Sequence, residues 1–300
     1  MSKVVIVGCG FVGMSYAYSL LNQRTKVDEL VLIDIDEKKA KGEAMDLNHG
    51  IAFAPSKINI KSGTYQDCDN ADIICICAGK NQDIGETRLD LVKKNYIVFD
   101  SIIKKIKKTK FNGIYLIATN PVDIMTLITK KLSGFSASKV IGSGTMLDTS
   151  RLRYLVGNKL NINPKNVHAY VVGEHGDSEF VPWTNAIVGV KNISEYLSNK
   201  ELDSIALSVK NAAYDIINNK GVTCYGIGMC LTRITNAILD DESSILSVSV
   251  YNKSLDLYYG MPAVVNKNGI REIINLKMTE EEKEKLNNSI SVLTRIKNIL

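Results

Sequence analysis

The sequence predicts an α/β protein in which a doubly wound parallel sheet is followed by a second, α+β domain. Short apolar runs alternate with helical patterns through the first half of the chain. These runs are almost continuously apolar, which is typical of strands that are buried on both faces of a parallel sheet. The alternation stops near residue 145, so we predict domains at 1–143 and 144–300.

The first half contains five predicted strands with helices between them. The strand ranges are 3–8, 29–34, 72–79, 113–120 and 139–144, and the helix ranges are 11–23, 37–49, 87–108 and 122–132. Glycines follow the first strand at once, and an acid, Asp34, ends the second. This order of elements is that of a doubly wound domain.

The second half has a different pattern. Helices are predicted at about 147–157, 199–219 and 223–240, and closely spaced strands at 244–251 and 261–267. The chain ends on a helix with one apolar stripe, made by Leu286, Ile290, Leu293, Ile296 and Leu300. No repeat, low-complexity tract or flexible linker is evident, so we expect the two halves to pack tightly.

The composition is that of a soluble globular protein. Apolar residues make up 45% of the 300 residues and charged residues 23%, with a net charge of +5. No apolar run is long enough to span a bilayer. The chain begins directly with a strand and no signal peptide, so we expect a cytoplasmic location. The lysine-rich run 104–110 lacks interleaved aromatics, which favours a solvated helix face over a nucleic-acid patch.

The cysteines indicate neither a disulfide framework nor a metal site. None of the six has the CxxC spacing of a zinc or redox motif. Cys75 and Cys77 alternate with isoleucine, as residues of a buried strand do. We therefore expect reduced, structural thiols and no bound metal.

Three glycines predict a dinucleotide site. Gly8, Gly10 and Gly13 form the pattern GxGxxG between a strand and a helix, and Asp34 ends the next strand. The first glycine permits a tight turn, the second lets backbone approach a pyrophosphate, and the third lets the helix pack on the strand. An acid at Asp34 accepts hydrogen bonds from the ribose hydroxyls and repels a 2′-phosphate, which favours NAD over NADP. A purely structural βα turn is the alternative.

A histidine with possible partners points to proton transfer. His175 lies in VVGEHGD, where a β-branched run ends, and Asp148 and Arg151 lie one helical turn apart in LDTSR. An aspartate can hold one imidazole nitrogen and raise its pKa, which leaves the other nitrogen for proton transfer. An arginine can bind a carboxylate through two hydrogen bonds. Arg88 and Asn120 are further polar candidates, and a structural or solvated histidine is the alternative.

These motifs together resemble the L-lactate/malate dehydrogenase family. The resemblance covers nearly the whole chain through GCGFVG, VLID, CAGKNQDIGETRLDLV, ATNPVDIMT, GSGTMLDTSRLRYL, VVGEHGDSEFVPWTNA and KGVTCYGIG, in that order. It implies an NAD-binding Rossmann domain joined to a catalytic, substrate-binding domain. It also implies hydride transfer between a nicotinamide cofactor and a small 2-hydroxy acid.

The resemblance assigns a role to each candidate. His175 would exchange a proton with the substrate oxygen, oriented by Asp148, while Arg151 would bind the substrate carboxylate. Arg88, brought in by loop closure, would polarise the carbonyl. Further residues implied at the substrate are Asn120 and Thr223, and those implied at NAD are Gly8, Gly10, Val12, Gly13, Asp34, Lys39, Tyr65, Gly79, Lys80, Ser101, Ala118, Asn120 and Ser143.

The loop GKNQDIGETR indicates which keto acid is the substrate. Oxaloacetate carries a second carboxylate, and burying that anion without a cation is costly. Gln82 offers an amide where the malate branch of the family carries arginine, so we expect pyruvate and L-lactate as substrates. Ile84 stands where bacterial relatives often have proline, which puts the rate of loop closure in question. The alternatives are a malate dehydrogenase and a non-catalytic NAD-sensing module.

Arg153 and His168 match a regulatory pattern. In bacterial L-lactate dehydrogenases, such a pair resembles the basic subunit-interface site for fructose 1,6-bisphosphate. A bisphosphate shared between two subunits would neutralise repelling charges and favour the assembled, active state. A surface salt bridge or structural imidazole is the alternative, and a homotetramer is the assembly that the resemblance implies.

Overall fold

The computed structural model describes residues 1–80 and 88–299, apart from the side chain of Arg88. Within these residues, the main sheet has nine strands in the order β12-β11-β10-β6-β5-β4-β1-β2-β3. Six of them are parallel and form the doubly wound half in the order β3-β2-β1-β4-β5-β6. Their bounds are β1 Lys3–Val7, β2 Glu29–Ile33, β3 Asn59–Ser62, β4 Ile73–Ile76, β5 Ile114–Ile117 and β6 Val140–Gly142.

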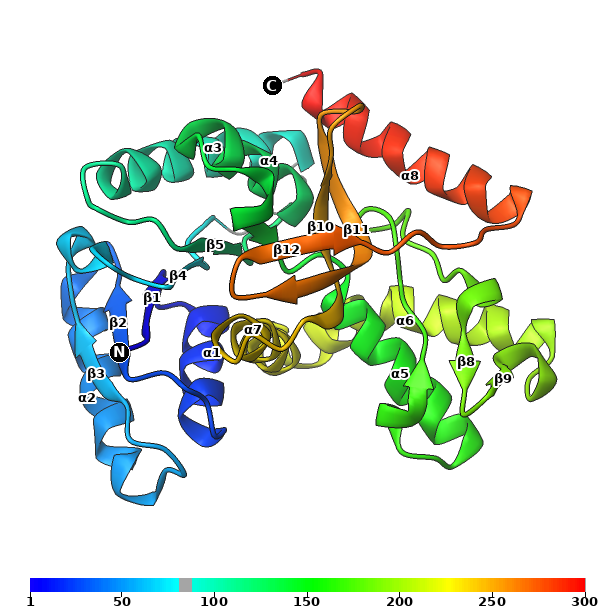
Figure 1. Cartoon of the computed structure of the whole chain (residues 1–300), viewed down its shortest axis with the longest axis horizontal. Coiled ribbons are helices and arrows are strands. Elements are labelled where there is room, and N and C mark those ends of the chain that lie inside the picture. The colour runs from blue at the N-terminus through cyan, green and yellow to red at the C-terminus, as the bar shows by residue number, and fades with distance from the viewer. Residues whose placement is uncertain (81–87, 300) are drawn as a thin grey trace.

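Helices cover this parallel sheet on its two faces (Figure 1). They are α1 Phe11–Asn22, α2 Glu37–Gly50, α3 Arg88–Ile106 and α4 Val122–Ser133. The reason for burial on both faces is visible in β4 and β5, where each residue is at most 2% exposed. The α/β fold class that the sequence predicts is confirmed.

The second half extends the same sheet and adds a smaller one. Strand β10 joins the edge of β6 in antiparallel fashion, with Ser249 opposite Gly142, and two further antiparallel strands follow it. These strands are β10 Ser244–Asn252, β11 Leu257–Asn266 and β12 Gly269–Ile273. The smaller sheet consists of β7 Val167–His168, β8 Ile187–Val188 and β9 Lys191–Asn192.

Four long helices surround these strands. They are α5 Met146–Leu160, α6 Asn199–Lys220, α7 Tyr225–Leu239 and α8 Glu280–Lys297. Helix α7 packs against α1 of the first half, which ties the two halves together (Figure 1). The short 3₁₀ turns are η1 Ile51–Phe53, η2 Tyr65–Cys68, η3 Ala137–Lys139, η4 Pro164–Asn166, η5 Trp183–Asn185 and η6 Ile193–Glu195.

Two edge strands, β3 and β12, were not predicted from the sequence. β3 and β12 lie at opposite ends of the main sheet, and neither carries an apolar run. In β3 only Ile60 is buried, because an edge strand with one covered face needs few apolar residues. β11 also begins at Leu257, four residues before the expected start.

Among the described residues, no helix is both long and apolar enough to cross a membrane. The six cysteines all fall within the described chain and form no disulfide. In α8, the expected stripe includes Leu293, which is fully buried, whereas Leu300 lies outside the described residues.

Candidate active site

His175, Asp148 and Arg151 meet as the sequence predicts. His175 lies on the segment that follows Val172, and the other two lie on the first turns of α5. The Nδ1 atom of His175 is 2.6 Å from Oδ2 of Asp148, and Arg151 donates to Oδ1 of Asp148 over 2.8 Å. The side chain of Asp148 is 2% exposed and that of His175 is 24% exposed. The imidazole therefore reaches the surface of the cavity while its partner stays buried.

The charges of this cluster support one another. Burial opposes the charge of His175, but the Asp148 carboxylate and its hydrogen bond outweigh burial and raise the pKa of His175 to about 9. Burial likewise opposes the charge of Asp148, yet His175 and Arg151 hold the pKa of Asp148 below its usual value. Both shifts favour an ionised Asp148 and a protonated His175 at neutral pH, and the Nε2 atom of His175 is left to exchange a proton with a substrate.

Glu179 joins the cluster, and sequence reasoning missed it. Its carboxyl atom and ligand atoms of Asp148 and His175 all lie within 4.8 Å of one another. Burial, and then the negative charge of Asp148, raise the pKa of Glu179 to about 9, so its carboxyl group is neutral at pH 7. This arrangement disfavours a metal ion, because His175 and Arg151 already occupy both oxygens of Asp148 and a metal ion would compete with the guanidinium charge.

A cavity opens in front of this cluster. Its volume is about 200 Å³, and its polar lining includes Asn120, Arg151, His175, Glu179 and Tyr214. Leu91 and Ile217 supply apolar walls. Thr223, which the family resemblance places at the substrate, lies between α6 and α7 and does not line this cavity.

The three glycines of the first turn have different surroundings. A Cβ on Gly13 would lie 2.0 Å from the carbonyl oxygen of Gly8, and one on Gly8, at φ +106°, would lie 2.4 Å from the nitrogen of Ala78. A Cβ on Gly10 would meet nothing within 4 Å. Packing therefore requires Gly8 and Gly13, whereas at Gly10 the backbone faces open space at the N-terminus of α1, as a pyrophosphate site needs.

Asp34 is held in place at the end of β2. Its Oδ2 atom accepts from the backbone N–H of Cys9 at 2.7 Å, and Oδ1 accepts from that of Asp36 at 3.0 Å. These bonds fix the carboxylate next to the glycine turn, as a ribose-binding acid requires. The other expected NAD residues are distributed around this edge: Lys39 is exposed on α2, Tyr65 half-buried on η2, and Ser101 exposed on α3.

Asn95 joins the cofactor edge to the substrate cavity, and sequence reasoning missed it. This fully buried amide accepts from the backbone N–H of Lys80 at 2.7 Å and donates to the carbonyl of Asn120 at 2.8 Å. Gly79 lies against it, since a Cβ there would be 2.5 Å from Thr119 and 3.2 Å from Asn95. The remaining residues expected at NAD are Val12 and Ala118, both half-buried, and Ser143, which is buried.

Part of the expected site lies outside the described residues. Gln82 and Ile84 fall in the segment 81–87, and the side chain of Arg88 is not described, although its backbone begins α3.

Arg153 and His168 lie on neighbouring elements. Arg153 projects from α5, donates through Nε to the carbonyl of Ala169 at 3.2 Å, and its guanidinium lies 5.3 Å from the ring centre of Tyr170. His168 is exposed on β7, directly before Ala169. The structure thus brings the two basic side chains to one edge of the small sheet, away from the residues that line the substrate cavity.

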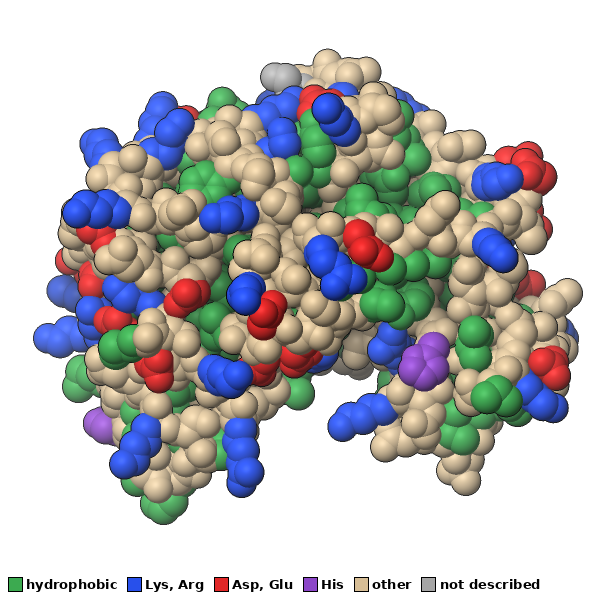
Figure 2. Space-filling view, viewed as in Figure 1, with side chains coloured by type: hydrophobic (Ala, Val, Ile, Leu, Met, Phe, Trp, Pro, Cys, Tyr) green, Lys and Arg blue, Asp and Glu red, His purple; other side chains and the backbone are tan. Residues whose placement is uncertain are grey.

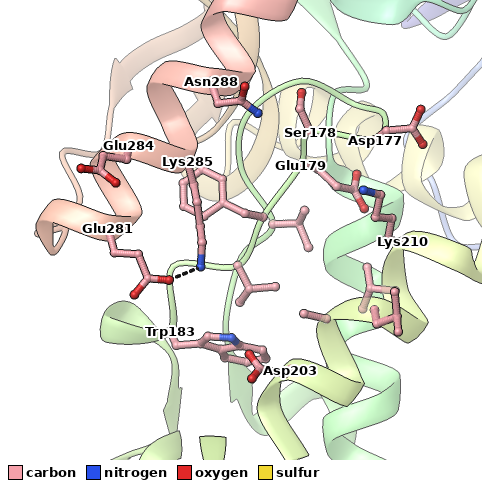
Figure 3. A pocket seen from close by; sticks show the side chains of 16 residues that line it. Asp177, Ser178, Glu179, Trp183, Asp203, Lys210, Glu281, Glu284, Lys285 and Asn288 are labelled. Carbon is pink, nitrogen blue, oxygen red and sulfur yellow. Dashed lines mark ion pairs between the residues drawn. The ribbon is translucent and has the colours of Figure 1, made fainter. Parts of the chain in front are cut away.

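A larger hollow lies on the other side of Glu179. It has a volume of about 570 Å³ and separates α6 from α8 (Figure 3). Its floor includes Trp183, and its rim includes the ion pair of Lys285 with Glu281 at 2.7 Å. It shares Asp177, Glu179 and Lys210 with the substrate cavity. On the face of the molecule that Figure 2 shows, charged side chains of both signs are interspersed.

Comparisons with known proteins agree over the full length. The model of the lactate/malate dehydrogenase NAD-binding domain matches residues 2–142, and that of the lactate/malate dehydrogenase α/β C-terminal domain matches residues 145–299. The chain is 51% identical to L-lactate dehydrogenase 1 of Peribacillus psychrosaccharolyticus, over 99% of this chain and 96% of that protein. It is 48% identical to L-lactate dehydrogenase of Geobacillus stearothermophilus, over 98% and 96%.

Solved structures give the same answer. A lactate dehydrogenase from a Medee basin deep-sea metagenome library has a TM-score of 0.96 at 52% identity, covering 98% of this chain and 97% of that one. The minor L-lactate dehydrogenase of Enterococcus mundtii has a TM-score of 0.97 in its ligands-bound form, at 46% identity over 100% and 98%. Its ligands-unbound form scores 0.90, at 45% identity over 98% and 96%. The chain therefore belongs to the lactate/malate dehydrogenase family.

Proposed function

We propose that this chain is an NAD-dependent L-lactate dehydrogenase that interconverts pyruvate and (S)-lactate as the last step of lactate fermentation. The observation that carries this proposal is the contact of His175 with Asp148 and of Asp148 with Arg151, at the wall of a cavity beside a cofactor-binding turn. Family membership and relatives that are about half identical support it.

The residues divide the chemistry among them. NADH, when bound, supplies the hydride that reaches the keto carbon of pyruvate. His175 gives the proton on Nε2 to the carbonyl oxygen, because Asp148 holds Nδ1. Arg151 uses one N–H on Asp148 and keeps its remaining donors for the substrate carboxylate. Reversal of these steps oxidises lactate, with neutral His175 as the proton acceptor.

A histidine variant tests this role. His175→Asn should lower kcat at least about a thousandfold, the contribution expected of a positioned general acid together with its charge, and leave NADH binding intact. His49→Asn is the matched control, since His49 is exposed on α2 and outside the site. Turnover by His175→Asn at the rate of the control would refute the assignment.

We propose pyruvate over oxaloacetate on the basis of Gln82, a residue outside the described part of the structure. A neutral amide tolerates the methyl group of pyruvate and leaves a second carboxylate without a counter-charge. The test compares kcat/KM for the two keto acids in the parent and in Gln82→Arg. We expect the parent to prefer pyruvate. In Gln82→Arg, kcat/KM for oxaloacetate relative to pyruvate should rise by several orders of magnitude at most, since one paired buried charge is worth about 3–5 kcal/mol. A parent that prefers oxaloacetate would identify a malate dehydrogenase instead.

We propose that fructose 1,6-bisphosphate binds at Arg153 and His168. Their common edge on α5 and β7 supports a shared polyanion site, and a bisphosphate would need charge from a second subunit as well. The test is a titration of fructose 1,6-bisphosphate at sub-saturating pyruvate. A lowered KM in the parent and a flat response in Arg153→Gln are the expected results, and a flat response in both would remove the site.

We propose a homotetramer located in the cytoplasm. Support for assembly comes from large apolar side chains that are exposed on α1, η1 and α7, namely Phe11, Tyr18, Phe53, Tyr225 and Met229. Exposed apolar groups gathered on neighbouring elements are typical of subunit interfaces. Light scattering should give a mass near four times 33.1 kDa, and a monomer would overturn the proposal. Cell fractionation with NADH-dependent pyruvate reduction as the marker tests the location.

We also propose that the boundary between residues 143 and 144 separates two domains with different functions. Residues 1–143 carry the cofactor edge, and residues 144–300 carry His175, Asp148 and Arg151. The cofactor edge and the pair of His175 with Asp148 therefore come from different halves of the chain.

A further inference from the structure

Asp123 is a buried carboxyl group that the mechanism above does not use. It lies in the first turn of α4, between Val122 and Ile124, and is 2% exposed. Burying a carboxylate is costly unless hydrogen bonds compensate for the lost water. Its position at a helix N-terminus offers some compensation through the helix dipole. The rest must come from its partners.

Those partners come from two other segments of the chain. Oδ2 of Asp123 accepts from the backbone N–H of His175 at 2.9 Å, and Oδ1 accepts from the hydroxyl of Ser249 at 2.6 Å. Ser249 lies on β10 opposite Gly142 of β6, so it is fixed to the main sheet. One carboxyl group therefore connects α4, the segment that bears the catalytic imidazole, and the sheet.

The residues beside His175 are held by a second helix. The backbone N–H of Glu174 donates to Oγ of Ser289 on α8 at 2.6 Å, and Ser178 bonds to both of these residues. The segment that carries the imidazole is thus anchored to both α8 and α4. The contact on the α4 side is made to His175 itself.

The charge of Asp123 differs from that of Asp148 in one respect. Asp148 has the guanidinium of Arg151 within 2.8 Å, so its negative charge is partly offset. Among the described residues, the hydrogen-bond partners of the Asp123 side chain are a neutral amide and a neutral hydroxyl. The negative charge of Asp123 is therefore available to favour a positive charge on the neighbouring imidazole.

We propose that Asp123 is a positioning residue for proton transfer, whose carboxylate fixes the backbone of His175 and whose negative charge stabilises the protonated imidazole. This inference rests on the proposed role of His175. It assigns two separable effects to one side chain, because a hydrogen-bond acceptor can be kept while its charge is removed.

The pKa values are consistent with action near neutral pH. Burial raises the pKa of Asp123 to about 6, although its bonds to Ser249 and His175 oppose this shift, so the group is ionised above that pH. Several titratable and charged groups among the described residues surround this site. They are Asp123 on α4, Asp148 and Arg151 on α5, Lys210 and Tyr214 on α6, and Glu174, Asp177 and Glu179 on the segment of His175, with Cys230 on α7 behind Asp148 and Arg151.

Two variants of Asp123 separate the effects. Asp123→Asn keeps an acceptor for the N–H of His175 and removes the charge, whereas Asp123→Ala removes both. Thr129→Val is the matched control, because Thr129 is also buried on α4 and, among the described residues, its hydroxyl donates only to the carbonyl of Met125, at 2.8 Å. The readouts are kcat and KM for pyruvate against pH, and the NMR titration of the His175 ring, which is tractable with three histidines in the chain.

We expect Asp123→Asn to lower the pKa of His175 in both readouts by on the order of half a pH unit. The loss of pyruvate reduction at high pH then begins at lower pH, and KM at neutral pH stays within about twofold, because Arg151 is untouched. Asp123→Ala should lose roughly ten- to a hundredfold more kcat than Asp123→Asn, since His175 is no longer held in place. Thr129→Val should leave both profiles unchanged.

The outcomes distinguish this inference from the function on which it rests. An unchanged titration of His175 in Asp123→Asn refutes the electrostatic part, and equal kcat in the Asn and Ala variants refutes the positioning part. If neither variant folds, Ser249→Ala replaces them. Without the Ser249 hydroxyl, Asp123 loses a hydrogen bond that favours its charged form, so the inflection of kcat near pH 6 should move to higher pH. No movement of this inflection counts against the inference. Full activity of His175→Asn would instead overturn the proposed proton donor.

Discussion

Alanine substitutions in the glycine turn should separate folding from cofactor binding. The three glycines share one motif, yet only Gly8 and Gly13 lie against other backbone. Gly10 has φ −82° and ψ −172°, an extended conformation that alanine adopts without strain. Gly10→Ala should therefore fold normally, whereas Gly13→Ala should be destabilised, although both remove a glycine from the same helix start.

The expected magnitudes follow from the geometry. A Cβ 2.0 Å from the Gly8 oxygen forces β1 and α1 apart, and overpacking of this kind costs about 1–3 kcal/mol or more. Gly10→Ala should instead change the free energy of unfolding by about −0.5 to +1 kcal/mol, since alanine restricts the unfolded chain. A methyl group where the pyrophosphate approaches should weaken NADH binding at least about tenfold, or about 1.4 kcal/mol.

The assay combines urea unfolding without cofactor and calorimetric titration with NADH. Parent-like stability with weakened NADH binding is the expected result for Gly10→Ala, and lost stability is the expected result for Gly13→Ala. If Gly10→Ala bound NADH as tightly as the parent, the open space at Gly10 would not be the pyrophosphate site and the reasoning would be wrong.

Three further substitutions test other contacts. Glu179→Gln should change kcat/KM at pH 7 by less than about threefold, because the raised pKa of Glu179, about 9, already makes this group neutral. Folded Glu179 keeps a proton that the unfolded chain releases above its ordinary pKa of 4.5. The parent should therefore lose stability relative to Glu179→Gln between pH 5 and 9, as measured by urea unfolding. The same dependence of unfolding free energy on pH in both proteins would contradict the raised pKa. Asn95→Ala should lower kcat/KM for pyruvate about tenfold or more, because Lys80 and Asn120 lose their common partner; wild-type kinetics would show that this link is dispensable. Gly173→Ala should lower the melting temperature, because φ is +95° and the new Cβ would lie 2.5 Å from Oγ of Ser289; an unchanged melting temperature would mean that α8 yields easily.

The sequence predicts most of the parallel half because each of its inner strands is an uninterrupted apolar run. β4 and β5 contain no charged or amide side chain, so their composition alone predicts that they are buried. β3 escapes this reasoning since Asn59, Lys61 and Ser62 give it a polar composition, and it becomes a strand only by pairing with β2. Pairing is a tertiary event, and edge strands depend on it most.

The candidate site shows the same division. His175 and Asp148 carry recognisable motifs, and the structure brings them into contact across 27 positions of sequence. Glu179 and Asp123 are ordinary acids in the sequence, and their importance arises from burial that no local pattern displays. One feature of the sequence does indicate that Asp123 is buried. It is an acid within the apolar run that begins α4, and a buried acid needs hydrogen-bond partners.

The junction of β6 with β10 has a consequence for dissecting the chain. A fragment that ends at residue 143 would expose the edge of Val140–Gly142, with its backbone groups open to pairing by any other strand. It would also lose α7, which covers α1. The cofactor-binding half should therefore self-associate or aggregate when it is expressed alone. Grafting it into another enzyme would require an edge-covering strand to be carried along.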